Sequence, residues 1–350
     1  MNQIFLDEKG IKEKLFPFTH TRSVADLRVG ILTLREKWEI FYQFKIGENE
    51  GSGLSIPANW IPNPMLLNFI AKSGKVPDEN SIESKDIIRL QYPWDICKYN
   101  GGEIRNDFAQ ITEGRISEPI PASSTVISPQ NVFIEKGARL EYVHLNASQG
   151  PIYIGRDAEI MEGSVLRGPI AICEAAVVKM GTIIYGATTL GPHTVAGGEI
   201  KNSIMLDYSN KAHLGYLGDS VIGAWCNLGA GTSNSNLKNN AGSIKVWVEA
   251  EKAFVEAGQK CGLLMGDYSR SAINTSFNSG TVVGICCNVV SSGLTPKYIP
   301  HFSWSENEIY SLDKLIRDLK EWKKLKNQLL TDEEIQALTH IFEQIKSNRT

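Results

Sequence analysis

A six-residue repeat constrains this chain more than any other feature of its sequence. In steps of six, seven successive positions hold aliphatic residues: Ile154, Ile160, Leu166, Ile172, Val178, Ile184 and Leu190. Most positions four residues further on hold a small residue, as at Ala158 and Thr182. An α-helix repeats about every 3.6 residues and a strand every two, so neither explains this period. A triangular solenoid does, because each hexapeptide supplies one short strand and one corner.

The repeat predicts a parallel β-helix whose aliphatic residues point inward and whose stacked strands pair about 4.8 Å apart. It resumes later in two shorter runs: Ile222 and Leu228, then Met265, Ser271, Phe277, Val283 and Val289, of which Ser271 is the weak member. Two polar stretches, 201–220 and 233–244, break the step of six. We predict that both are loops that leave the solenoid. Some other all-β array is the alternative fold.

The repeat reaches neither end of the chain, and this indicates three parts. We predict a short α/β domain over residues 1–128, the β-helix over 129–300 and C-terminal helices over 301–350. Two helix-capping boxes are expected in the last part: Ser305 with Glu308, and Thr331 with Glu334. These helices are expected to cover the open end of the β-helix, whose last strand would otherwise expose unpaired backbone groups.

Composition and charge narrow the range of partners. The 350 residues carry a formal net charge of −3, with both signs spread along the chain, so the basic field that nucleic acids require is absent. No stretch approaches the roughly 20 apolar residues of a membrane helix, and the N-terminus does not read as a signal peptide. The six cysteines show no CxxC pair. These features predict a cytoplasmic protein with reduced thiols that binds neither nucleic acid nor membranes.

The chemistry of the sequence centres on His213, in the first break of the repeat. A neutral imidazole can accept a proton from an amine that attacks a thioester, as an N-acyltransferase requires. A structural or solvent-exposed loop histidine is the alternative. Lys201 and Tyr216 lie near it in the sequence and could contact a phosphate and a sugar. The glycines of NLGAGT at 227–232 would let backbone amides approach an acyl oxygen, although solenoid corners also favour glycine.

This stretch resembles the acetyltransferase domain of the bifunctional bacterial enzyme that makes UDP-N-acetylglucosamine. The matching motifs are Lys201, KAHLGYLGD at 211–219, IGAWCNLGAGT at 222–232 and Asn236. The resemblance implies a left-handed β-helix that forms a homotrimer, and acetyl-CoA as the cosubstrate. It further implies an amino-sugar phosphate or a nucleotide-linked amino sugar as the acceptor.

The same resemblance implies a role for each matching residue. His213 would be the general base, and Lys201 and Tyr216 would contact the sugar phosphate. Asn227 and Asn236 would bracket the amine and acetyl groups, and Ala230 with Gly231 would contact acetyl-CoA. Three positions differ from the family: Ile183 stands where an arginine for the sugar phosphate is expected, and Leu237 and Lys238 replace a Tyr and an Asp. Arg167 or Lys179 would have to substitute for that arginine.

Nearly the whole chain resembles a GlmU-like subgroup of sugar nucleotidyltransferases. The similar segments are FPFTHTRSVADLRVGILTLREKW at 16–38, YPWDI at 92–96, the coil segment 150–181, SNLKNN at 235–240 and MGDYSRSAINTSFNSGTVVG at 265–284. The resemblance implies a nucleotidyltransferase-like N-terminal domain that would use Mg²⁺ if active. The triphosphate-gripping GxGTxM…PK loop of that family is absent, and Arg22 is the residue that could replace its lysine.

The leading hypothesis is therefore an N-acetyltransferase that makes nucleotide-sugar or cell-envelope precursors. Nucleotidyl transfer by the N-terminal domain and a catalytically silent trimeric scaffold are the alternatives. A β-helix carbonic anhydrase would need two zinc-binding histidines five residues apart, and none of the six histidines has that separation. We therefore predict no structural metal.

Overall fold

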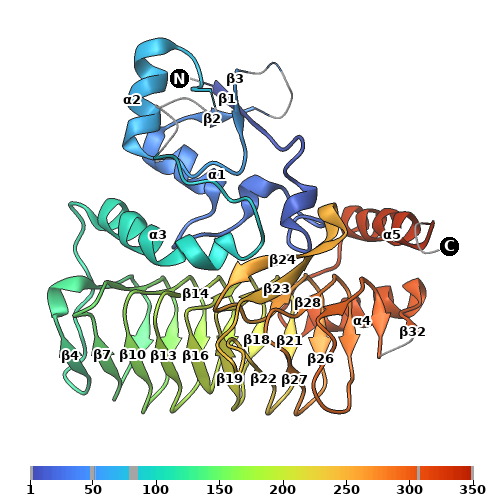
Figure 1. The fold of residues 1–350 in the computed structure, drawn as a ribbon. Coiled ribbons are helices and arrows are strands. Elements are labelled where there is room, and N and C mark those ends of the chain that lie inside the picture. The colour runs from blue at the N-terminus through green and yellow to red at the C-terminus, as the bar shows by residue number, and fades with distance from the viewer. Residues whose placement is uncertain (1–2, 48–50, 52, 79–85, 306–307, 348–350) are drawn as a thin grey trace.

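The protein is a β-helix with an α/β region packed on one side and two helices at its C-terminal end (Figure 1). The computed structural model describes residues 3–47, 51, 53–78, 86–305 and 308–347. The predicted fold class is confirmed, because strands from successive coils pair in parallel from Thr125 to Trp304. Within the described residues, no helix is long and apolar enough to cross a membrane.

Three walls enclose the β-helix, and each coil adds one strand to each wall. The first wall comprises β4 (Thr125–Ile127), β7 (His144–Asn146), β10 (Val165–Arg167), β13 (Ile183–Tyr185), β16 (Glu199–Lys201) and β19 (Tyr216–Gly218), and the pair β22 (Ser233–Asn234) and β27 (Ser276–Phe277) follows β19. The second comprises β5 (Val132–Ile134), β8 (Ile152–Ile154), β11 (Ile170–Ile172), β14 (Thr188–Leu190), β17 (Ile204–Met205), β20 (Val221–Ile222), β25 (Leu264–Met265), β28 (Val282–Val283) and β30 (Tyr298–Ile299). The third comprises β6 (Arg139–Leu140), β9 (Glu159–Ile160), β12 (Val177–Val178), β15 (Val195–Ala196), β18 (Asn210–Lys211), β21 (Asn227–Leu228), β26 (Arg270–Ser271), β29 (Asn288–Val289) and β31 (Ser303–Trp304), with β32 (Glu308–Ile309) antiparallel at its end.

The interior of the β-helix is the predicted aliphatic column. All seven residues from Ile154 to Leu190 are at most 1% exposed and belong to one core. Ser271, the weak member of the later run, also lies on a buried strand position in register with Leu228. Each coil therefore returns one side chain per wall to the interior.

The prediction that residues 201–220 form a loop outside the solenoid is wrong. β17, β18 and β19 lie in this stretch and pair in register with the coil before them. The inward positions come sooner than every sixth residue because Gly197 and Gly198 turn one corner in two residues, and the corner at 202–203 is one residue shorter than its counterpart in the coil before. The coils become shorter, while the three walls continue.

The second break also differs from its prediction. β22 still belongs to the stack at residues 233–234, and the chain leaves the solenoid only after it. The excursion carries an antiparallel hairpin of β23 (Ile244–Val248) and β24 (Ala253–Gly258), joined by a 3-10 turn at Glu249–Glu251. Ile244 and Val246 are fully buried in the core of the N-terminal region, so the hairpin joins that region to the coils.

The N-terminal region packs on the outer face of the second wall. Its parallel sheet has the order β2-β1-β3, and its elements are β1 (Gln3–Asp7), β2 (Lys45–Ile46), β3 (Leu54–Pro57), α1 (Leu34–Glu36), a π-helical turn (Lys37–Phe41), α2 (Pro64–Ser73), α3 (Asp95–Thr112) and the 3-10 turns Glu13–Leu15 and Val24–Asp26. Outward residues of the second wall, among them Ile204 and Val221, share its core with Trp38 and Trp60. The region is thus built against the β-helix.

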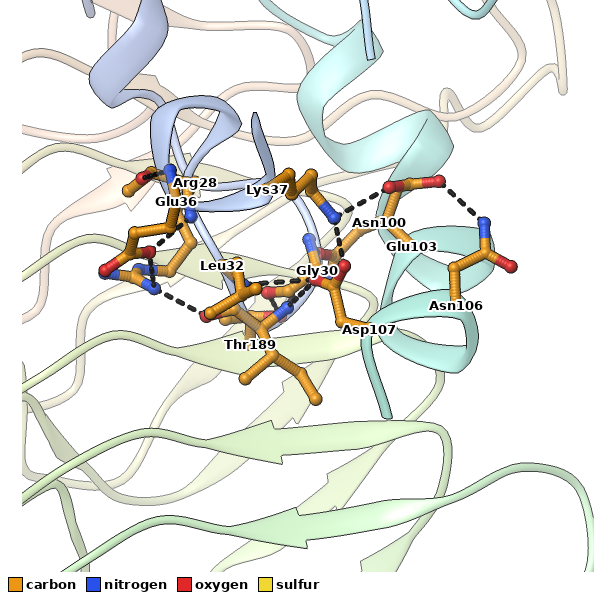
Figure 2. A network of polar contacts seen from close by, with 12 residues as sticks. Arg28, Gly30, Leu32, Glu36, Lys37, Asn100, Glu103, Asn106, Asp107 and Thr189 are labelled. Atoms are coloured by element: carbon orange, nitrogen blue, oxygen red, sulfur yellow. Dashed lines mark hydrogen bonds and ion pairs between the residues drawn. The ribbon is translucent and has the colours of Figure 1, made fainter. Parts of the chain in front are cut away.

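A buried polar network fixes this packing (Figure 2). Lys37, 1% exposed, donates to Glu103 at 2.7 Å and to Asp107, both on α3. The other oxygen of Asp107 accepts the backbone N–H of Ile31 at 2.8 Å. Gly30 approaches so closely that a Cβ there would lie 2.4 Å from Asp107. The network therefore ties α3 to the segment around Gly30.

Two further contacts carry this network onto the second wall. Asn100 of α3 accepts the N–H of Gly30 at 2.8 Å and donates to the carbonyl of Ala187 at 2.9 Å. Thr189 of β14 donates to the carbonyl of Gly30 at 2.9 Å. Because these groups are buried, each satisfied pair makes one docking orientation favourable over others.

The C-terminal helices are α4 (Leu312–Lys324) and α5 (Asp332–Ser347). The expected capping box at Thr331 and Glu334 is present, with reciprocal bonds of 2.9 and 3.2 Å. The box expected at Ser305 is wrong, because Glu308 begins β32 and the helix starts only after Ser311. The helices pack on Tyr268, Cys286 and Phe302, which lie at the corner between the second and third walls. They therefore run along the side of the last coils, whereas we expected them to close the end.

Candidate active site

His213 lies on the corner between the third and first walls. Residues 212–215 join β18 to β19, and the His213 side chain is exposed. Its imidazole makes no hydrogen bond within the described part of the chain. The ring is therefore open to a ligand that approaches this corner.

Ala230 and Gly231 occupy the same corner one coil later. The N–H of Gly231 donates to the carbonyl of Leu214 at 3.0 Å, which stacks this corner on that of His213. The carbonyl of Ala230 accepts from Asn274 at 2.7 Å, whereas its N–H has no acceptor among the described residues. Of the two amides predicted to contact acetyl-CoA, only that of Ala230 is free to donate to an acyl oxygen.

Tyr216 begins β19 directly after this corner, and its side chain extends along the first wall toward Lys201 and Asn236 near the wall's other edge. The hydroxyl of Tyr216 accepts from the Asn236 amide at 3.1 Å, and that amide also donates to Asp219. Lys201 lies in register with Gly218, and its Nζ is 5.7 Å from the centre of the Tyr185 ring. Burial, with the nearby charge of Asp219, raises the pKa of Tyr216 to about 12. Tyr216 thus keeps its proton at neutral pH.

The Tyr216 ring folds over Gly218, two residues further along the same strand. A Cβ at Gly218 would lie 2.3 Å from the Tyr216 hydroxyl oxygen. The YLG part of the motif is therefore explained by packing: the glycine leaves room for the tyrosine to lie flat on the wall.

Asn227 and Arg22 lie apart from this group. Asn227 is on the outer face of the third wall, between Asn210 and Arg270 in register. Arg22 lies at the corner between the second and third walls, where it pairs with the buried Asp267. Burial opposes its charge, but the Asp267 carboxylate outweighs burial and raises the pKa of Arg22. This ion pair joins the N-terminal region to the coils.

Lys211 is a residue of this corner that sequence reasoning missed. It is 1% exposed, and its Nζ donates to the carbonyls of His213 at 2.6 Å and Gly197 at 3.3 Å. Burial lowers its pKa to about 8, and it has no carboxylate partner among the described residues. The sequence could have revealed Lys211 as a charged residue at an inward position of the repeat, in register with Ala196. The ammonium group holds the loop that carries His213.

Neither Ile183 nor Arg167 places an arginine beside Tyr216. Ile183 is 48% exposed on the first wall. It is in register with Glu199 of the next coil, and Glu199 is in register with Tyr216 of the coil after that. Arg167 lies in the row of Lys201, with Tyr185 between them. A cation at Arg167 is thus two strands from Lys201.

His20, Glu249 and His301 form a cluster of the kind that can hold a metal, with ligand atoms within 4.8 Å of one another. His301 Nδ1 accepts the N–H of Ile285 at 3.0 Å, so its proton must lie on Nε2. That nitrogen is 2.6 Å from Glu249 and donates to it. A metal would need the same nitrogen without its proton. The cluster is therefore a packed junction in which Glu249 is hydrogen-bonded to His301 and lies 3.7 Å from His20 Nε2, and the His301 tautomer does not fit a metal ligand.

Comparisons with known proteins support the resemblance inferred from the motifs. A family model described as "Sugar nucleotidyl transferase" matches residues 3–50. "Bifunctional protein GlmU" of Methanocaldococcus jannaschii is 34% identical over 44% of this chain and 34% of the relative. The protein of that name from Methanococcus maripaludis is 28% identical over 65% of this chain and 48% of the relative. The chain thus spans less than half the length of these relatives.

One solved structure among those that match is the Francisella novicida UDP-N-acetylglucosamine acyltransferase. It aligns with a TM-score of 0.30 and 14% identity over 64% of this chain and 76% of that one. By its own topology the chain is a parallel β-helix protein. Within that class, its sequence is similar to the sugar nucleotidyl transferases and to the proteins named bifunctional GlmU.

The His20 junction should make stability depend on pH. Burial lowers the pKa of His20 from 6.5 to about 4, so between these values the unfolded chain holds more protons than the folded one. His20 alone therefore contributes a loss of stability as the pH falls from about 7.5, which reaches about 2 kcal/mol at pH 5. His20→Phe keeps the stacking on Phe16 and should remove this loss, as measured by urea unfolding at both pH values. The exposed His144→Phe is the control, and an unchanged pH dependence in His20→Phe would contradict the assignment.

Proposed function

We propose that the protein is an acetyl-CoA-dependent N-acetyltransferase that acts on an amino-sugar phosphate or a nucleotide-linked amino sugar, in nucleotide-sugar or cell-envelope precursor synthesis. The observation that carries this proposal is that His213 and the free amide of Ala230 share one corner, and that the Tyr216 cluster lies on the adjoining first wall. The acceptor class comes from the resemblance. The relatives are longer than this chain and are named as bifunctional proteins, so their substrates belong to the proposal.

In this mechanism His213 Nε2 or Nδ1 accepts a proton as the amine nitrogen attacks the acetyl carbonyl. The N–H of Ala230 donates to the oxygen that becomes negative in the tetrahedral intermediate. The C–N bond has formed at this point, and collapse breaks the C–S bond. The CoA thiolate leaves and takes the proton from the imidazolium, which restores neutral His213.

The first wall would hold the acceptor in this reaction. The Lys201 ammonium suits a phosphate oxygen, and the Tyr216 hydroxyl and Asn236 amide suit sugar hydroxyls. Lys211 would act through the backbone: by holding the carbonyl of His213 it fixes where the base stands.

The general base can be tested by His213→Ala. Loss of a general base slows proton transfer by about a hundredfold or more, so CoA release from acetyl-CoA with glucosamine-1-phosphate should fall by that factor. His144→Ala, also exposed and on the first wall, should leave the rate unchanged. An undiminished rate in His213→Ala would exclude this mechanism.

We further propose that the chain forms a homotrimer. Leu214 and Ile273 are 79% and 70% exposed on the corner that carries His213, and apolar side chains this exposed favour association. Asn227, on another wall, would reach the acceptor of a neighbouring copy. Light scattering should give three times the 38.7 kDa of one chain, and Leu214→Glu should lower it. A monomeric mass for the unaltered chain would refute the trimer.

Nucleotidyl transfer by the N-terminal region is a second candidate, and a cavity supports it. The cavity, of about 460 Å³, lies where β1 and β3 end and is lined by Asp7, Lys9, Lys14 and Arg89, among others. Ligands of parallel α/β sheets bind at this edge. The lysines suit a triphosphate, and Asp7 is the carboxylate that would hold Mg²⁺. Arg22 would have to leave Asp267 to take part.

This candidate predicts pyrophosphate release from UTP and N-acetylglucosamine-1-phosphate with Mg²⁺. Lys9→Met with Lys14→Met should lower the rate at least about tenfold, because charge-assisted bonds to phosphate are lost. Lys72→Met, exposed on α2, is the control. If the unaltered chain releases no pyrophosphate, the cavity has no such activity; if it also transfers no acetyl group, the silent scaffold is favoured.

A further inference from the structure

Arg270 is a buried guanidinium without a counter-charge. It is 8% exposed on the outer face of the third wall. Its Nε has no hydrogen-bond partner, and its Nη1 makes one long contact of 3.4 Å to the carbonyl of Tyr268. No ion pair joins it to a carboxylate in the described part of the chain. Hydrogen bonds and ion pairs within the protein therefore replace little of the hydration that the guanidinium loses on burial, and this loss is costly for a charged group.

The nearby acid is occupied elsewhere. Asp318 accepts from the Tyr310 hydroxyl at 2.6 Å and lies 3.4 Å from Arg317. Burial lowers the pKa of Arg270, and Tyr310, the nearby cysteines and Asp318 only partly oppose this effect. The other buried arginines differ: Arg22 pairs with Asp267, and Arg28 lies within 3.8 Å of Asp207.

Neutral amides and an aromatic ring surround the Arg270 guanidinium. Asn227 and Asn288 are its register partners on β21 and β29, about one strand spacing to either side. Trp322 of α4 covers it, with the Arg270 Cζ 4.8 Å from the ring centre. The site thus has one cation, two amides that donate or accept, and a flat apolar roof.

We propose that Arg270, with Asn227 and Asn288, binds a phosphate group between α4 and the outer face of the third wall. The planar fork of a guanidinium matches phosphate oxygens, and the flanking amides can donate to those that the fork does not reach. A bound dianion would supply the missing counter-charge, so the burial cost in the free protein is recovered on binding. Asn227 is shared with the proposed acetyl transfer, whereas Arg270 has no part in that reaction, so variants of Arg270 test the phosphate site separately.

Inorganic phosphate is the first probe, with the full chain and at constant ionic strength. Phosphate should raise the melting temperature of the unaltered protein, because a ligand that binds only the folded state stabilises it. Arg270→Met keeps the volume under Trp322 and removes the charge, so affinity should fall about ten- to a hundredfold. Arg139→Met is the matched control, since Arg139 is on the outer face of the same wall, exposed and paired with Glu159.

Stability without multivalent anions provides a second readout. Removal of an unpaired buried charge is neutral or stabilising, so Arg270→Met should melt no lower than the unaltered protein. Arg270→Lys, which retains charge without the planar fork, should bind phosphate more weakly than the unaltered chain. The proposal is overturned if phosphate does not stabilise the unaltered chain, or if Arg270→Met responds as strongly as that chain.

The source of the phosphate can be distinguished in the same assay. Glucosamine-1-phosphate against glucosamine tests a sugar phosphate, and CoA against 3′-dephospho-CoA tests the cosubstrate. The pair whose difference disappears in Arg270→Met identifies the ligand. An inactive acetyltransferase that still binds phosphate through Arg270 would separate this inference from the proposed function.

Discussion

Parallel strand pairing from one coil to the next is the constraint on which the rest of the structure depends. Each coil must place one strand in each wall, about 4.8 Å above the last, and one side chain in each inward column. The corners need not have a fixed length. This is why two glycines can shorten the corner at 197–198, and why a hairpin can leave after β22, while β20 and β25 still pair in register. The candidate site lies on such a corner, where stacking holds the backbone and the side chains remain free.

The same constraint explains which features the sequence could predict. The column from Ile154 to Leu190 predicts the β-helix because burial demands aliphatic residues at a fixed spacing. The shortened coils could not be found this way, since hydrogen bonds between strands keep them in place when the spacing changes. The hairpin at 244–258 packs on residues more than 180 positions earlier, such as Trp60. The hydrophobic pattern of the hairpin itself cannot identify a partner so distant in the sequence. In the site, motif matching located His213, Tyr216 and Asn236, but the free amide of Ala230 follows only from the bonds of its neighbours.

The N-terminal region is held by paired charges. Lys37 with Glu103 and Asp107, and Arg22 with Asp267, are buried ion pairs that link it internally and to the coils. Such pairs add little net stability, because desolvation offsets most of their attraction, but the loss of one partner would be costly. Their effect is to favour a single docking on the second wall. Among the described residues, the N-terminal region thus covers the second wall and leaves the outer face of the first wall, with the half-buried Lys201 and Tyr216, on another side.

The β-helix treats its own buried charges differently. Among the described residues, Lys211 lies inside the coils with only carbonyls as partners, and Arg270 lies under Trp322 with no carboxylate partner. By contrast, Lys37 and Arg22 in the N-terminal region each have a buried carboxylate partner. Uncompensated charges lower stability, and proteins retain such costs mainly where binding or catalysis requires them. Lys211 is under the loop of His213, and Arg270 is next to Asn227. We therefore expect ligands to bind at two places, the corner above Lys211 and the third wall at Arg270, where a negatively charged group would balance the cation.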